Sequence, residues 1–181
     1  MTANYPKEAN PSSKISAFGS INCQMVSGLP ILVVRDSAKN NGPEFDIVDE
    51  ALYHMRTNIF MRDFPAKTGA DRLIIYLTFY GMKCLKFFAK NKKDKSKCQL
   101  EIDGWNLKPF PIPGEGGFII DSYVTAPKDE NEKRILRDYF KKLRVEMGNR
   151  LLQKVFAQGP EADKWWVCFS NKKFLDKEMA N

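Results

Sequence analysis

GADRLIIYLTFYGMKCLKFFAK, the stretch from Gly69 to Lys90, carries large apolar or aromatic side chains at most positions between Leu73 and Phe88. A helix without a continuous polar face is buried in protein or in lipid. A bilayer span needs ~20 mostly apolar residues, and a threonine and two lysines interrupt this shorter run. We therefore expect a central helix over 69–90 that other helices surround. Two buried strands would fit the same composition, but the length without a turn signal favours a helix.

The composition is that of a globular protein with an excess of basic residues. Of 181 residues, 43% are hydrophobic and 28% are charged, which excludes wholesale disorder. The 29 Lys and Arg against 22 Asp and Glu give a net charge of +7. This charge favours an acidic partner, which could be nucleic acid, anionic lipid or an acidic protein surface.

Four scattered cysteines, with no C-x-x-C pair and a single histidine, make a structural zinc site improbable, so we expect no metal and no cofactor. Cys84 and Cys168 are expected to be small buried residues, because both lie in apolar or aromatic segments. The N-terminal residues have no apolar signal segment. We expect a reduced, cytoplasmic protein.

The predicted fold is all-α, with a single helical domain over 46–181 and an extended N-terminal arm over 1–45 that packs on it. The arm is rich in Pro, Ser, Asn and Gly, and its one apolar run should place Ile31, Leu32 and Val34 on the core. Pro30 within this run makes a central strand unfavourable.

A helix is expected to begin at Asp46, because an acidic N-cap precedes an apolar stripe with helical spacing. Glu50 and His54 are one turn apart on its other face, together with Thr57 and Asn58. A catalytic carboxylate–histidine pair is one interpretation of this arrangement, and a solvated polar face is the other. We expect the solvated face and no catalytic residue, since no nucleophile, base and orienting group come together in the sequence.

Two segments read as loops. The lysine-rich run over 90–97 cannot bury apolar surface and is expected to be an exposed loop, with a nucleic-acid site as the less favoured interpretation because no aromatic residues interleave it. The Pro-rich and Gly-rich segment over 109–118 should be extended and then sharply turned. Its glycines are not followed by the residues that a phosphate-binding loop needs.

The longest predicted helix runs from Asp129 to Phe156. Its apolar residues recur at steps of three and four and define a core stripe, made of Leu136, Phe140, Leu143, Met147, Leu151 and Val155. Basic residues follow the same spacing on another face and form a predicted basic ridge, made of Arg134, Arg137, Lys141 and Arg144. The ridge is either a solvated face or a contact surface for an acidic partner.

The chain ends in an aromatic and basic segment with Trp165, Trp166, Lys172 and Lys173. Adjacent residues on a helix point about 100° apart, so both tryptophans can be buried only between two surfaces. One of these surfaces could belong to a partner, because Trp is enriched at interface hot spots. Two core tryptophans are the alternative.

Several short motifs, in this order and spacing, resemble those of subunit 3, the 21 kDa subunit, of the actin-related protein 2/3 complex. They are Asp46-Ile-Val-Asp-Glu-Ala, Ala70-Asp-Arg, Phe110-Pro-Ile-Pro-Gly-Glu, Gly117-Phe, Lys164-Trp-Trp with Cys168-Phe, and Phe174 with its basic neighbours. The resemblance implies a non-catalytic helical scaffold subunit without a nucleotide site. It also implies binding to the actin-related protein 3 subunit in a seven-member assembly that nucleates branched actin filaments.

The resemblance therefore predicts partners among the subunits of that complex and actin filaments, and neither nucleic acid nor a membrane span. A basic nucleic-acid-binding module is the alternative function, favoured only by the net charge. The arm and Gly116, where the family tends to have proline, depart from the family pattern. We place candidate partner-binding residues on the basic ridge and at the aromatic end of the chain.

Overall fold

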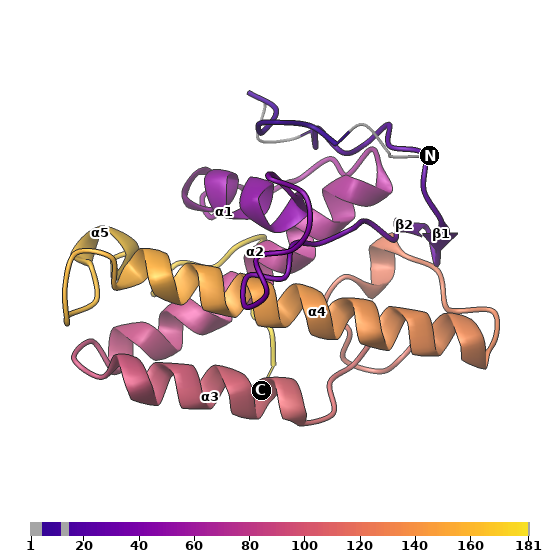
Figure 1. The fold of residues 1–181 in the computed structure, drawn as a ribbon. Coiled ribbons are helices and arrows are strands. Elements are labelled where there is room, and N and C mark those ends of the chain that lie inside the picture. The colour runs from indigo at the N-terminus through magenta and orange to yellow at the C-terminus, as the bar shows by residue number, and fades with distance from the viewer. Residues whose placement is uncertain (1–4, 12–14, 181) are drawn as a thin grey trace.

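The computed structural model describes residues 5–11 and 15–180, and these form five α-helices, one 3₁₀ helix and one two-stranded antiparallel ribbon. Helices dominate, as predicted, but the two-stranded ribbon means that the predicted all-α class is only approximately correct. The elements follow one another in the order β1 (Met25–Val26), β2 (Leu29–Pro30), α1 (Ile47–Asn58), α2 (Gly69–Lys90), α3 (Lys95–Leu107), the 3₁₀ helix (Asp121–Tyr123), α4 (Glu130–Val155) and α5 (Lys164–Val167) (Figure 1).

Helix α2 begins and ends at the residues predicted from the sequence. Thr68 and Asp71 form a capping box at its N-terminus, which satisfies backbone N–H groups that the first turn leaves free. From Leu73 to Leu85 every residue except Lys83 is buried. In Figure 1, α2 passes between α1 and α3 and crosses behind α4, and it also contacts α5 and β2. Its apolar sides are therefore covered by protein.

Gly81 permits the close approach of methionines from two neighbouring helices to α2. A Cβ atom at this position would lie 2.7 Å from the methyl carbon of Met55 on α1 and 2.6 Å from that of Met147 on α4. Real Cβ contacts are longer than this, so the glycine lets the three helices pack at their present separation.

Helix α4 confirms the predicted core stripe. Asp129 is its N-cap and accepts a hydrogen bond from the backbone N–H of Glu132. All six predicted stripe residues are completely buried. Gly148 lies against α3, where an added Cβ would be 2.7 Å from Cγ2 of Ile102. A side chain of α3 thus explains this glycine.

Helix α3 was not predicted, and it corrects the expected loop over 90–97. Lys90 is the last residue of α2, a turn follows, and α3 begins at Lys95. Asp94 supplies the cap, because its carboxylate accepts a hydrogen bond from the backbone N–H of Lys97 at 2.8 Å. The lysine-rich run therefore joins two helices and contributes the first turn of the second.

The polar face of α1 is buried, which corrects the predicted solvated face. Glu50, His54 and Asn58 are buried, and of the four residues assigned to this face only Thr57 is exposed. The Glu50 carboxylate accepts hydrogen bonds from the Ser16 hydroxyl at 2.6 Å and from the Ala17 backbone N–H at 2.8 Å. The arm, which Figure 1 shows beside α1, therefore provides the hydrogen-bond donors to Glu50, where the sequence analysis expected water.

The middle of the arm forms the ribbon and packs on the core. Residues 27 and 28 make the turn between β1 and β2 with φ of 55° and 77°, as expected for a two-residue hairpin loop. Beyond β2, Leu32 and Val34 are buried and Ile31 is half-buried against the core, as predicted. The Tyr139 hydroxyl of α4 accepts a hydrogen bond from the Leu32 backbone N–H at 3.3 Å.

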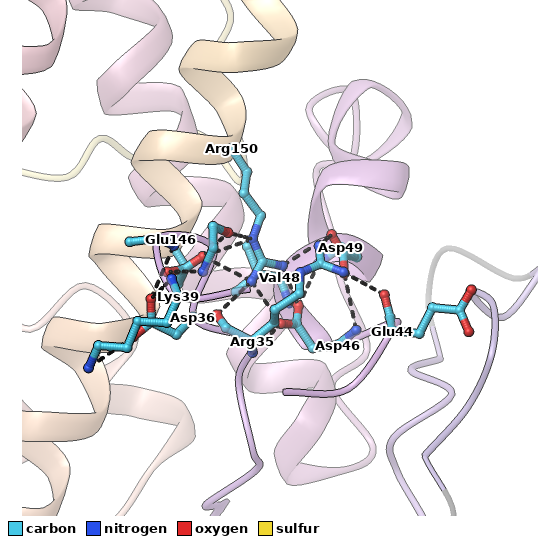
Figure 2. Close-up of polar contacts among 11 residues, drawn as sticks. Arg35, Asp36, Lys39, Glu44, Asp46, Val48, Asp49, Glu146 and Arg150 are labelled. Carbon is cyan, nitrogen blue, oxygen red and sulfur yellow. Dashed lines mark hydrogen bonds and ion pairs between the residues drawn. The ribbon is translucent and has the colours of Figure 1, made fainter. Parts of the chain in front are cut away.

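The end of the arm is fixed by Arg150 of α4 (Figure 2). Its guanidinium forms a bidentate pair with Asp46, with Nη1–Oδ1 and Nη2–Oδ2 distances of 2.7 Å and 2.9 Å. It also donates to the Arg35 carbonyl at 2.9 Å and pairs with Glu146 at 3.0 Å. Glu146 accepts hydrogen bonds from both the backbone and the hydroxyl of Ser37. Because Asp46 is also the N-cap of α1, one arginine joins the arm, α1 and α4.

Candidate functional site

The predicted basic ridge on α4 is only partly exposed. Arg134 and Lys141 are exposed. Arg137 is half-buried because its guanidinium donates to the Phe110 carbonyl at 3.0 Å and forms an ion pair with Glu115. Arg137 therefore holds the Pro-rich segment over 109–118 against α4. Of the predicted ridge, Arg134 and Lys141 thus remain exposed for contact with a partner.

Arg144 was predicted to lie on the basic ridge, and this prediction is wrong. Its side chain lies inside the molecule, with 4% of its surface exposed. Its guanidinium carbon lies 4.7 Å from the ring centroid of Tyr80 and 4.2 Å from that of Phe110, which is cation–π geometry. It also donates to the carbonyl of Trp105 at 3.3 Å. Arg144 thus joins α2, α3, α4 and the segment after α3. The regular spacing of the ridge gave no sign of these neighbours, which come from distant parts of the sequence.

The two tryptophans of α5 have different environments. Trp166 is buried, and the guanidinium of Arg56 on α1 lies 5.1 Å from its ring centroid. Trp165, the residue before it, is 66% exposed. The angle between adjacent helical residues thus places one ring in the core and the other on the surface. Of the two, Trp165 alone is available to a partner.

Trp165 belongs to an exposed surface that we call the aromatic end. It comprises Phe60, Trp165 and Phe169 with the cations Arg56, Lys164 and Lys172. Phe60 is 60% exposed and packs edge-to-face on Phe169, with 5.7 Å between the ring centroids. The ammonium groups of Lys164 and Lys172 lie 5.3 Å and 5.8 Å from the rings of Trp165 and Phe60. Lys173, next to Lys172, is also exposed.

The structure does not join the ridge to the aromatic end. Arg134 lies in the second turn of α4, whereas α5 follows the other end of that helix (Figure 1). At 1.5 Å per residue, the part of α4 beyond Arg134 alone is about 30 Å long. The candidate residues therefore form two separate surfaces. Sequence reasoning missed Phe60. The sign of it in the sequence was an aromatic residue directly after Ile59, the buried C-cap residue of α1.

A profile of the family described as "P21-Arc: ARP2/3 complex ARPC3 (21 kDa) subunit" matches residues 12–179. The chain belongs to this family. It is therefore a structural, non-catalytic subunit of the ARP2/3 complex.

Relatives in distant eukaryotes agree with this assignment. Actin-related protein 2/3 complex subunit 3 of Dictyostelium discoideum is 40% identical over 167 residues, which cover 88% of this chain and 94% of the relative. The probable subunit 3 of Caenorhabditis elegans is 35% identical over 181 residues, with 97% and 95% covered. Subunit 3 of Saccharomyces cerevisiae is 28% identical over 149 residues, with 80% and 83% covered. The likeness thus extends over most of each chain.

His54 and Glu50 have different neighbours in the structure. The His54 ring contacts Tyr53, with 4.8 Å between the centroids, and the Glu50 carboxylate accepts hydrogen bonds from Ser16 and Ala17 of the arm. Within 5–11 and 15–180, no cluster of three His, Cys, Asp or Glu residues suits a metal ion. The same part of the chain contains no helix long and apolar enough to cross a membrane.

The cysteines differ in exposure, and this difference predicts their reactivity. Cys84 is buried as expected and Cys98 is buried as well, but Cys168 is exposed, which corrects its predicted burial. Burial raises the pKa of Cys84 to about 12 and that of Cys98 to about 11, so both thiols are protonated at neutral pH. The thiolate is the reactive form. Cys84 and Cys98 are therefore expected to be unreactive, because they are inaccessible and because their thiols are protonated.

We expect iodoacetamide to alkylate Cys168 first, while Cys84 and Cys98 react only after unfolding. Cys23 is half-buried, and burial raises the pKa of its thiol, so it should react more slowly than Cys168. Peptide mass spectrometry after timed labelling of the native protein measures the order. Denatured protein is the control, in which all four cysteines should react. Labelling of Cys98 as fast as Cys168 in the native protein would contradict the packing of α3.

Proposed function

We propose that this protein binds the actin-related protein 3 subunit through the aromatic end, and that it supports nucleation of branched actin filaments as a scaffold in the cytoplasm. The observation that carries this proposal is that Phe60 and Trp165 are both exposed, each with a lysine ammonium group over its ring. Large exposed aromatic groups are unusual on a surface that faces only water, and they are enriched at protein interfaces.

The chemistry of the aromatic end fits an acidic protein surface. Its three cations are exposed, and the chain as a whole carries +7. Burial of a central aromatic side chain supplies most of the affinity of such interfaces, while charges at the rim guide association. In this proposal Trp165 is the central residue. Arg134 and Lys141 belong to a second surface, which can steer the subunit toward its neighbours in the complex.

The test is the dissociation of the subunit from the assembled complex. Trp165→Ala should accelerate dissociation about thirtyfold at any ionic strength, since truncation of a buried aromatic hot spot costs about 2 kcal/mol or more. Leu100→Ala is the matched control, because Leu100 is also a large exposed apolar residue, 72% exposed on α3. Circular dichroism checks that each variant is folded. Normal dissociation of the folded Trp165 variant would exclude the aromatic end as the docking surface.

Two further measurements separate steering and contact. Reversing Arg134 and Lys141 to glutamate should slow incorporation mainly at low salt, because charges at exposed sites act through a screened field. Cys168, which follows Trp165 on the next turn, should lose its reactivity toward iodoacetamide in the assembled complex. Unchanged labelling of Cys168 after assembly would place the contact elsewhere.

A further inference from the structure

A hollow of about 700 Å³ lies between α2, α3 and the C-terminal residues. Its floor is apolar, and Phe87 and Trp105 pack edge-to-face there with 5.7 Å between their ring centroids. The C-terminal segment ends beside α3 in Figure 1, and its residues Met179 and Ala180 line both this hollow and an adjoining one of about 300 Å³. These hollows are distinct from the aromatic end, although Lys172 borders both surfaces.

The rim of the larger hollow is strongly basic. We call it the basic groove, and its cations are Lys83, Lys86, Lys90, Lys108, Lys172 and Lys177. The carboxylates that line it are Glu101 and Glu178, and Glu178 belongs to the C-terminal segment itself. Burial lowers the pKa of Lys83, and the nearby cations Arg144 and Lys108 lower it further. Positive charge in the groove is thus only partly compensated by the protein.

The C-terminal segment occupies one part of the groove through few contacts. Glu178 forms an ion pair with Lys86 at 2.6 Å, and the Ala180 carbonyl accepts a hydrogen bond from the Lys83 ammonium at 3.0 Å. Met179 is half-buried against the core, whereas Glu178 and Ala180 are exposed. An exposed ion pair contributes ~1 kcal/mol or less. A ligand with the same groups can therefore displace this segment at low cost.

We propose that the basic groove binds an extended acidic segment of a partner protein, with apolar side chains between its carboxylates, and that residues 178–180 compete with it for the groove. The chain's own Glu-Met-Ala sequence shows the mode of binding, with a carboxylate on Lys86, a carbonyl on Lys83 and an apolar side chain toward the floor. This surface shares only Lys172 with the aromatic end, and the proposal does not depend on that docking contact.

The geometry of α2 favours an extended peptide over a single small anion. Lys83, Lys86 and Lys90 recur at steps of three and four, which places them on one face of the helix over about 10 Å. Alternate residues of an extended chain lie about 7 Å apart and point to the same side. A segment with carboxylates on one side and apolar groups on the other therefore meets the lysines and the aromatic floor together. Phosphate alone leaves the floor uncovered.

The experiment is fluorescence anisotropy with the full chain and a labelled peptide of alternating glutamate and methionine. The double variant Glu178→Gln with Met179→Ser weakens the competing segment and should raise peptide affinity several-fold. In that background, Lys83→Glu with Lys86→Glu should lower affinity by about tenfold or more, because the charges meet at close range in a partly dry site. The matched control is Lys142→Glu with Lys154→Glu, two exposed lysines of α4, which should change affinity less than about twofold.

Other probes decide between this ligand and its rivals. A peptide of alternating glutamate and serine should bind clearly more weakly; equal binding would mean that the apolar floor is not used and would overturn the proposal. Binding of a single-stranded oligonucleotide with the same dependence on Lys83 and Lys86 would assign the groove to nucleic acid. Loss of peptide binding in Trp165→Ala would show that the peptide binds the aromatic end instead. Circular dichroism confirms folding of each variant.

Discussion

Leu77→Asp is expected to abolish folding of the isolated chain. Leu77 is completely buried in α2, on which α1, α3, α4 and α5 all pack. The change removes about 1.5–3 kcal/mol of apolar burial, and it places a charge where no partner is available, at a cost of several kcal/mol more. A domain is typically stable by only about 5–15 kcal/mol. Far-ultraviolet circular dichroism and urea titration of the purified variant measure the outcome.

Two substitutions control for this result. Leu77→Ala makes a cavity without a charge and should cost about 2–5 kcal/mol while the protein stays folded. Leu100→Asp repeats the leucine-to-aspartate change at an exposed position of α3 and should shift stability by less than about 0.5 kcal/mol. Soluble Leu77→Asp protein with a cooperative urea transition would contradict the burial of α2.

Arg150→Leu is expected to destabilise the protein by about 3–5 kcal/mol, because removal of one partner from a buried ion pair leaves the other charge uncompensated. Asp46 is completely buried and Glu146 nearly so, and Arg150 pairs with both (Figure 2). The arm also loses the hydrogen bond to the Arg35 carbonyl. Urea titration followed by tryptophan fluorescence gives the change in unfolding free energy.

The controls for Arg150 separate charge from packing. Arg134→Leu makes the same substitution at an exposed position of α4 and should change stability by less than about 0.5 kcal/mol. Adding Glu146→Gln to Arg150→Leu removes one unpaired carboxylate, so the double variant should recover part of the lost stability. If Arg150→Leu is as stable as the wild-type protein, the ion network does not hold the arm.

The long helices could be predicted from sequence because their determinants are local. The apolar run over 69–90 and the cap and stripe that follow Asp129 each lie within one segment, and both helices have the predicted extent to within a residue or two. Helix α3 lacks such a pattern. It has a mid-helix glycine, Gly104, and Leu100 and Leu107 are exposed on its surface. Its periodicity was therefore too weak to reveal it.

The polar and aromatic sites depend on partners from distant segments, which periodicity does not identify. Glu50 is buried because Asn10, Ser16 and Ala17 of the arm donate hydrogen bonds to it. Arg144 has the same spacing as Arg137 and Lys141, yet rings from α2 and from the segment after α3 enclose it. Charged residues with the same helical spacing in the sequence can therefore be either exposed or buried in the fold.

The bond between Arg150 and Asp46 spans 104 residues, and this separation has a consequence for synthesis. On the ribosome Asp46 and Arg35 emerge well before Arg150, so their bonds to it can form only after most of α4 has left the exit tunnel. Closing such long loops is slow, because chain entropy is lost before the contact forms. Arg35 and Asp46 are thus translated well before Arg150 but are fixed only after it. During that interval the apolar residues of the arm, Leu32 and Val34 among them, are accessible to chaperones and proteases.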